Sequence, residues 1–354
     1  MISNSISGGV ILFKFSGVAT KSQSSGRVTG RVCSCDKQCM ESHHGEINNI
    51  DNSTLTISPR IHSNKGMNAK NLLLLLSLSL TSDLLLAKEQ EFMSDAAAVR
   101  FSISGSPNRA LKGMSTEVGF RQWTLITPLF YNKVESWSFA AGLRYEGTDL
   151  DYSNPLEINE DWLQSIDLPL LLMKEQAENL NWMLLFNPTL AGDYDNIDGD
   201  SFNYLTILGA RYRTSETFQW FFGALYTTGY DDNLFLPAIG FHWEISDRSD
   251  LLFAGPYLRY KYSLSDSLAL ILGGRFSGSK WHTRADYGER DFRLNAYRTS
   301  ATFQWEATEK HALLASLGWE FARKVEIKEA SGTVVLDRDL EHAPYFELGY
   351  RFHF

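Results

Sequence analysis

Cysteine is nearly absent from this chain. Its three cysteines, Cys33, Cys35 and Cys39, all lie near the N-terminus, and residues 88–354 contain none. A disulfide-stapled fold is therefore excluded for that part. The three thiols lie near two histidines, but we interpret them as chance residues of a leader, and we expect no metal site and no cofactor.

Long hydrophobic runs are also scarce. The one exception is residues 67–87, MNAKNLLLLLSLSLTSDLLLA, where Lys70 precedes a leucine-rich stretch that ends at Ala87. This layout predicts a secretory signal peptide, although Asp83 interrupts the run and Leu85 is large for its position. Residues 1–66 are rich in Ser, Asn and Gly, and we interpret them as a non-native or disordered leader, from a wrongly extended start. A helical membrane protein is excluded.

The chain also has fewer basic than acidic residues. Lys and Arg number 33 against 42 Asp and Glu, which gives a formal net charge of -9. Proteins that bind nucleic acids need a basic face, so we expect no nucleic-acid partner.

Apolar and polar residues alternate with a period of two through most of residues 88–354. The chain ends on YFELGYRFHF, in which Phe346, Leu348, Tyr350, Phe352 and Phe354 share one face. A period of two indicates β-strands. A soluble sandwich and a lipid-facing barrel both fit one such strand, but aromatic residues near strand ends and charges of both signs on the other face favour the barrel.

The pattern gives thirteen candidate strands, and single-chain bacterial barrels have an even number. Long loops alternate with short turns, and we assign the long loops to the extracellular side and the short turns to the periplasmic side. The assignments from the two ends of the chain meet at residues 234–263, where they agree only if the chain crosses the membrane once or three times. Crossings need about 9–11 residues each, so we favour one. We therefore predict an all-β, single antiparallel transmembrane barrel of about 12 strands, with 14 as the alternative, long extracellular loops and short periplasmic turns.

One stretch in this region carries a family resemblance. Residues 236–281 contain Pro237, Gly240 and Trp243, then Pro256, Tyr260 and Tyr262, and then Gly273 and Gly274. They resemble an uncharacterised family of bacterial outer-membrane β-barrels, of the domain of unknown function 6268 type. The resemblance implies a Gram-negative outer-membrane location and a porin-like fold, but no activity. From the residues alone, the glycines and prolines read as kinks and bulges.

The C-terminal strand resembles the signal that the barrel-assembly machinery reads, which would involve Tyr350, Phe352 and Phe354. The expected partners are this machinery, outer-membrane lipid and lipopolysaccharide. The acidic stretch Asp193–Asp200 has a calcium-loop composition but lacks the closing Glu, so we interpret it as a surface loop that could bridge lipopolysaccharide through cations.

Two functions stay open for the lumen: a narrow channel for small polar solutes, and a non-conducting structural or surface-interaction barrel with acidic loops. Mutual pairing of the inner charges would favour the second. The candidate pore-lining residues are Arg144, Glu146, Arg211, Arg213, Arg259, Lys261, Arg275, Glu306, Glu320, Glu347 and Arg351. An outer-membrane hydrolase is a third hypothesis, but no serine lies in a recognisable hydrolase motif near His242 or His282. We expect no catalytic residues and no enzyme.

Overall fold

In the computed structural model, the described residues are 98–354 without 155, 157, 159–160, 195–196, 230–232 and 286–287. The predicted leader and signal peptide lie outside them. Within this part of the chain, no helix is long and apolar enough to cross a membrane.

The described residues form β-strands and one short 3-10 helix, η1. The elements are β1 (Ala98–Ala110), β2 (Glu117–Val134), β3 (Trp137–Tyr152), β4 (Trp162–Asp167), β5 (Leu170–Ala177), β6 (Leu180–Gly192), η1 (Gly199–Ser201), β7 (Phe202–Arg213), β8 (Phe218–Thr227), β9 (Leu234–Ser246), β10 (Ser249–Ala254), β11 (Tyr257–Ser265), β12 (Leu268–Ala285), β13 (Gly288–Thr308), β14 (His311–Glu329), β15 (Val334–Leu340) and β16 (Ala343–His353).

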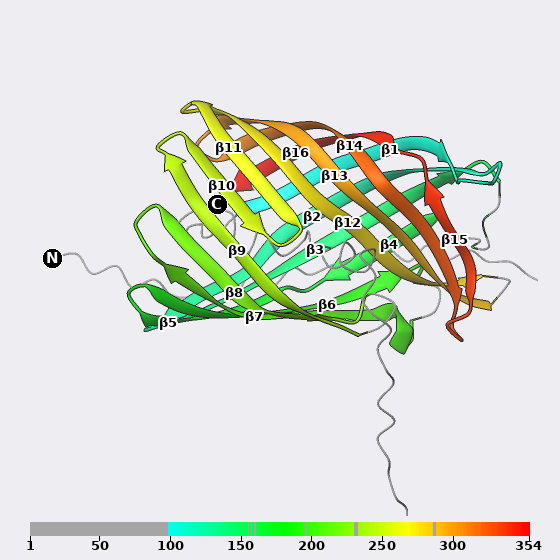
Figure 1. Ribbon diagram of the computed structural model, residues 1–354, viewed down its shortest axis with the longest axis horizontal. Helices are drawn as coiled ribbons and strands as arrows, with labels where there is room; N and C mark the ends of the chain where they lie inside the picture. Colours follow the sequence, from blue (N-terminus) through cyan, green and yellow to red (C-terminus); the bar gives the residue numbers. More distant parts are fainter. Residues whose placement is uncertain are drawn as a thin grey trace, which may run out of the picture. The chain divides into compact units, whose positions relative to one another are not determined.

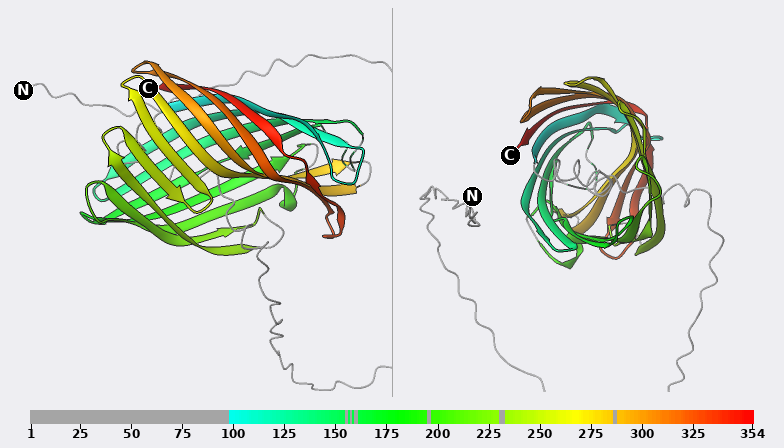
Figure 2. Two further views of the ribbon diagram at one scale, coloured as in Figure 1. Left: turned by 45° about the horizontal axis from the view of Figure 1, so that its top comes forward. Right: turned by 90° about the vertical axis from the view of Figure 1, so that its left-hand side faces the viewer.

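The strands close into an antiparallel barrel, because β1 pairs with β2 on one edge and with β16 on the other. Figure 2 shows this ring of strands from one end. β4 and β5 together make one crossing, since both pair with β3 and with β6. β15 and β16 likewise make one crossing beside β14. The described strands therefore make fourteen crossings, and the predicted all-β barrel is confirmed.

The fourteen crossings agree with the alternative count from the sequence analysis. The favoured count of about twelve is two too low. Residues 234–265 cross three times, as β9, β10 and β11, because β10 has only six residues and β11 only nine. Because both strands are short, the turn between β10 and β11 lies partway along the barrel, as Figure 1 shows. The expectation of full-length crossings favoured one crossing here, and three crossings were the alternative.

The outer face carries a belt of exposed apolar side chains. Tyr204 and Tyr212 mark its width on β7, since they are eight residues apart, roughly 27 Å along the strand. For strands tilted by about 40° this gives about 21 Å along the axis, close to the apolar band of outer-membrane barrels. Exposed Trp and Tyr side chains lie near the short-turn ends of several strands: Trp137, Trp182, Tyr212, Trp243, Tyr262, Trp305 and Tyr350.

A β-bulge in β14 changes which residues face inward. Asn295 pairs with Lys324 and Tyr297 pairs with Phe321, so β14 has one residue more than β13 between these pairs. Ala322 adopts a left-handed conformation there, with φ 48°. A bulge shifts the alternation by one residue, and Glu320 and Arg323 consequently both point into the barrel.

The outer part of the β12–β13 hairpin, residues 279–294, turns inward across the lumen, while β13 stays paired with β14 as far as Arg290. β11 pairs with β12 only as far as Gly274. Further along, His282 of β12 pairs with Gly192 of β6, which is almost opposite β12 in the ring. A Cβ on Gly192 would collide with the carbonyl oxygen of His282, so glycine permits this approach.

The hairpin occupies residues that the sequence pattern assigned to a long loop at 278–291. That stretch contains glycine, serine and many charges, which is typical of a loop, yet Lys280–Arg293 and Trp281–Phe292 are cross-strand pairs. The second expected loop, 324–343, is also largely strand, because β14 extends to Glu329 and pairs with β15. The loops at this end of the barrel are consequently shorter than predicted.

Candidate functional site

The lumen is the candidate site, and buried ion pairs fill its middle. Glu320 is completely buried, and its carboxylate contacts two guanidinium groups: Arg298 at 2.6 Å and Arg323 at 3.1 Å. Arg298 also stacks on the ring of Tyr345, 4.3 Å from its centroid. Three strands, β13, β14 and β16, thus meet around one buried negative charge.

Further ion pairs lie on either side of this cluster. Glu347 accepts from Arg100 of β1 at 3.1 Å and from Arg275 of β12 at 3.3 Å. Glu306 pairs with Arg351 at 2.6 Å. On the other side of the ring, Arg144 contacts Glu146 on its own strand and Asp167 of β4. These contacts tie neighbouring strands together across the inner face.

The remaining candidates lie elsewhere on the inner face. Arg259 pairs with Asp250 at 3.0 Å, and Lys261 follows on the same face of β11. Arg211 is buried opposite Asn181. Arg213 alone is exposed, because it lies at the last position of β7 beside a turn. The sequence therefore identified inward-facing charges, while their role in a pore stays a prediction.

His242 lies on the inner face of β9 and is buried. Its Nδ1 is 3.0 Å from the Gln219 amide, and its Nε2 is 3.5 Å from Asp250. Among the described residues its partners are thus an amide and a carboxylate, and a role for His242 in a hydrolase stays a hypothesis.

The inner face is not polar all round. Six buried apolar side chains on β5 to β9 form a separate cluster: Leu171, Leu185, Leu205, Ile207, Leu225 and Leu236. The sequence analysis assigned charges to the inner face and missed this patch, because leucines on both faces of a strand do not reveal which face is inward.

A cavity of about 120 Å³ lies between the β12–β13 hairpin and the wall formed by β3, β4, β6, β7 and β8. Charged groups line it on both sides, Arg144 and Asp167 from the wall and Lys280 and Arg293 from the hairpin. Apolar side chains, including Leu205 and Trp281, form part of the lining, and amides and hydroxyls form another part: Asn187, Thr189, Asn203, Thr227 and Asn295. A space of this volume admits several water molecules or a small polar solute.

An apolar cluster closes the lumen between the ion pairs and the end of the barrel that carries the β12–β13 turn. Trp281 and Phe292 of the hairpin stack with ring centroids 5.8 Å apart, and both are buried. They pack with residues of β2, β3, β4, β14, β15 and the loops, including Leu111, Val118, Phe120, Leu150, Leu156, Ile158, Leu163, Val325, Ile327 and Leu340. The hairpin therefore contributes the two aromatic side chains around which this apolar cluster packs.

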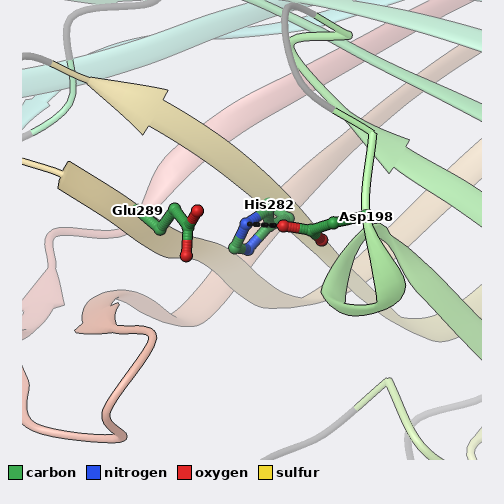
Figure 3. Close-up of side chains that lie close together, drawn as sticks. All are labelled: Asp198, His282 and Glu289. Atoms are coloured by element: carbon green, nitrogen blue, oxygen red, sulfur yellow. Dashed lines mark ion pairs between the residues drawn. The ribbon is translucent and has the colours of Figure 1, made fainter.

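At the mouth, beyond the apolar belt, three acidic or imidazole side chains converge. Asp198 precedes η1, His282 lies on β12 and Glu289 lies on β13, and one ligand atom from each lies within 4.8 Å of the others (Figure 3). His282 is buried, and its Nδ1 is 3.0 Å from Asp291 Oδ1. Asp291 also pairs with Lys280 at 2.9 Å.

The pKa values of this group are shifted by the contacts. The hydrogen bond to Asp291 raises the pKa of His282 against the opposing effect of burial, and Asp198 adds to the rise. The pKa of Asp291 is lowered: burial opposes the shift, but the bond to His282 and the charge of Lys280 outweigh it. The pKa of Asp198 is also lowered against burial, because the backbone N–H of Asp200 and the charge of His282 favour its anion.

Sequence reasoning missed several of these residues. Arg100, Asp167 and Arg298 lie in strands that it had identified, on the faces opposite the aromatic residues, so strict alternation could have found them. Arg323 and Glu289 had no such signal, because a bulge places the first and an unexpected strand places the second.

The C-terminal aromatic residues lie on the outer face of β16. His311 Nδ1 and the Tyr350 hydroxyl are 2.6 Å apart, and Phe352 packs between His311 and Phe354. Phe354 is 70% exposed. Their role as an assembly signal stays a prediction.

Several solved outer-membrane proteins are similar to this chain. An outer-membrane channel from Pseudomonas putida F1 has 11% identity and a TM-score of 0.41, with 73% of this chain and 95% of that chain covered. A Pseudomonas aeruginosa FadL homologue has 12% identity and a TM-score of 0.37, with 73% and 90% covered. The KdgM porin in complex with disordered oligogalacturonate has 6% identity and a TM-score of 0.32, with 73% and 99% covered. Values this low do not bear on function.

No curated protein matches the chain. A family model described as Domain of unknown function (DUF6268) matches residues 128–353, which is most of the barrel and includes the stretch that carried the resemblance. The chain therefore belongs to the DUF6268 family.

Proposed function

We propose that this protein is a bacterial outer-membrane barrel whose lumen is a narrow passage for small polar solutes, closed by the β12–β13 hairpin. The outer belt of apolar side chains with Trp and Tyr at its edge supports a membrane location. An even number of crossings puts both chain ends of the barrel on one side, which we assign to the periplasm. The partners are then outer-membrane lipid, lipopolysaccharide and the barrel-assembly machinery.

The cavity between the hairpin and the wall carries the passage proposal, because charged groups of both signs line it. Its walls bring opposite charges, Arg144 and Asp167, to a space that the hairpin covers with Lys280 and Arg293. Groups of both signs around a small space favour small polar or zwitterionic solutes over large or apolar ones. Since Trp281 and Phe292 fill the lumen above, solute passage requires the hairpin to move.

Conductance of a shortened hairpin tests this proposal. Gly278 and Asn295 face each other across the hairpin, so residues 279–294 can be replaced by an Asn-Gly turn without breaking the register below. In planar bilayers we expect rare or no current steps from the native protein and stable steps from the shortened variant. A shift between unboiled and boiled samples on a denaturing gel verifies that both proteins are folded barrels.

The second candidate is a structural barrel that never conducts, and the ion pairs favour it. Glu320, Glu347 and Glu146 are all buried against arginines, so the inner charges satisfy one another rather than a solute. A folded shortened variant that passes no current would support this candidate and exclude the passage.

A further inference from the structure

We propose that Asp198, His282 and Glu289 bind one divalent transition-metal cation of the Zn²⁺ type, and that this cation fastens the β12–β13 hairpin to the loop that follows β6. Each residue offers one ligand atom, and these atoms all lie within 4.8 Å of one another. Figure 3 shows the carboxylates of Asp198 and Glu289 on either side of the imidazole.

His282 is the main reason to infer a ligand. Its side chain is only 1% exposed, yet among the described residues its Nε2 makes no hydrogen bond and has only an ion-pair contact, with Asp198. A buried polar atom without a partner is costly. Because Nδ1 bonds to Asp291, the neutral ring would carry its proton on Nδ1 and leave the Nε2 lone pair, 3.4 Å from Asp198 Oδ2, for a ligand. A carboxylate behind a histidine is the usual support for a metal-bound imidazole.

The carboxylates are arranged to complete the site. Asp198 uses Oδ1 to accept from the backbone N–H groups of Asp200 and Ser201, which leaves Oδ2 directed at His282. The distance from Oδ2 to Nε2 is 3.4 Å. Two ligands at about 2.0–2.1 Å from a tetrahedral ion are roughly 3.3 Å apart, so these two atoms fit around one ion. Glu289 supplies a third ligand, and water would supply the fourth.

The ligand types select the class of cation. An imidazole with two carboxylates suits Zn²⁺ and its neighbours among the transition metals, whereas Ca²⁺ and Mg²⁺ prefer oxygen ligands only. The acidic composition of Asp193–Asp200 had indicated a calcium loop. The structure brings Asp198 to a histidine instead, which changes the expected ion.

The position of the site determines what the ion would do. His282 and Glu289 lie on the two strands of the hairpin, and Asp198 lies in the loop that β6 leads into, beside the pairing of His282 with Gly192. A bound cation would therefore hold the crossing hairpin at the far wall. This inference does not depend on conduction, because it concerns the binding of an ion to a folded barrel.

Metal binding to the purified, EDTA-stripped full-length barrel tests the inference directly. Equilibrium dialysis against Zn²⁺ with elemental analysis should give one saturable ion per chain, and excess Ca²⁺ should not displace it. Glu289→Gln should weaken the affinity at least 10-fold. Asp291→Asn should weaken it 10- to 100-fold, as loss of a carboxylate behind a metal-bound histidine does. Both variants should still shift on boiling.

His342→Ala is the matched control, since this histidine is exposed at the same end of the barrel and belongs to no such cluster. It should bind Zn²⁺ as the native protein does. The inference is overturned if the native protein binds no saturable Zn²⁺. It is equally overturned if folded Glu289→Gln and Asp291→Asn bind with native affinity, since His282 would then be only a charge partner of the two aspartates.

Discussion

Glu320 shows how a single residue can decide the state of the lumen. It is the only carboxylate within contact of both Arg298 and Arg323 in the described part of the chain, and all three residues are buried. A buried charge that loses its partner is far more costly than an exposed one. Glu320 can contact both arginines only because the bulge at Ala322 turns the side chain of Arg323 toward it.

We therefore predict that Glu320→Gln destabilises the barrel strongly, by about 3–5 kcal/mol, because two buried guanidinium groups would lose their counter-charge. Urea unfolding in lipid vesicles, followed by tryptophan fluorescence, measures this. Lys112→Met is the control, since its pair with Asp339 is solvent-exposed and should contribute no more than about 1 kcal/mol. Equal effects of the two changes would contradict the assignment.

Gly192 is a second residue with a specific structural role. Gly192→Ala would place a Cβ against the carbonyl oxygen of His282, so the hairpin should lose its contact with β6. Hydrogen exchange of residues 279–294 should then accelerate by 10-fold or more. Gly229→Ala is the control, because its Cβ would meet no atom closer than 3.7 Å. Unchanged protection of the hairpin in folded Gly192→Ala would refute the docking role.

At the scale of elements, the sequence predicts strands well where one face meets lipid and the other meets the lumen. Leu313, Leu317 and Trp319 of β14 and Phe346 and Leu348 of β16 alternate strictly, and their strands were found. The β12–β13 hairpin beyond residue 278 was not, since both of its faces pack on protein. Its alternation breaks down, and its pairing within the hairpin and with the extended end of β14 explains why it is a strand.

The hairpin should respond to pH when no metal is bound. The raised pKa of His282 means that its ion pairs with Asp291 and Asp198 stabilise the docked hairpin fully below about pH 6.5, and that this stabilisation is lost as pH rises through the higher folded-state pKa. The lowered pKa values of the two aspartates place the acid limit below about pH 3.8. Two further charged side chains lie beside these residues: Glu289 is close to His282 and Asp198, and Lys280 pairs with Asp291.

Limited proteolysis of the EDTA-stripped protein between pH 5 and pH 9 measures this. Cleavage within residues 279–294 should increase toward alkaline pH, after correction for the protease's own pH dependence with an unfolded substrate. His282→Gln should remove the dependence and be cleaved as at high pH. Cleavage that increases toward pH 5 instead would show that the charged histidine does not hold the hairpin.

At the scale of the whole molecule, the closed ring was predictable and the closed lumen was not. Ring closure follows from the β1 and β16 strands, whose outer faces are apolar and whose register joins Ala98 to His353. The filling of the lumen depends on a hairpin, a bulge and short central strands, which act over long distances. A count of inner charges could not show that Arg298 and Arg323 share one carboxylate.

The last strand should matter more for assembly in the cell than for the stability of the finished barrel. Phe354 is 70% exposed and follows the last paired residue, His353, so Phe354→Ala removes little packing. If this residue belongs to an assembly signal, the amount of barrel in the outer membrane should fall several-fold, while refolding of purified protein into detergent should be unchanged. Leu317→Ala is the control, because Leu317 is 74% exposed in the middle of the belt and should leave assembly in the cell near native. A native yield of Phe354→Ala in the outer membrane would show that the terminal aromatic residue is only part of the lipid-facing surface.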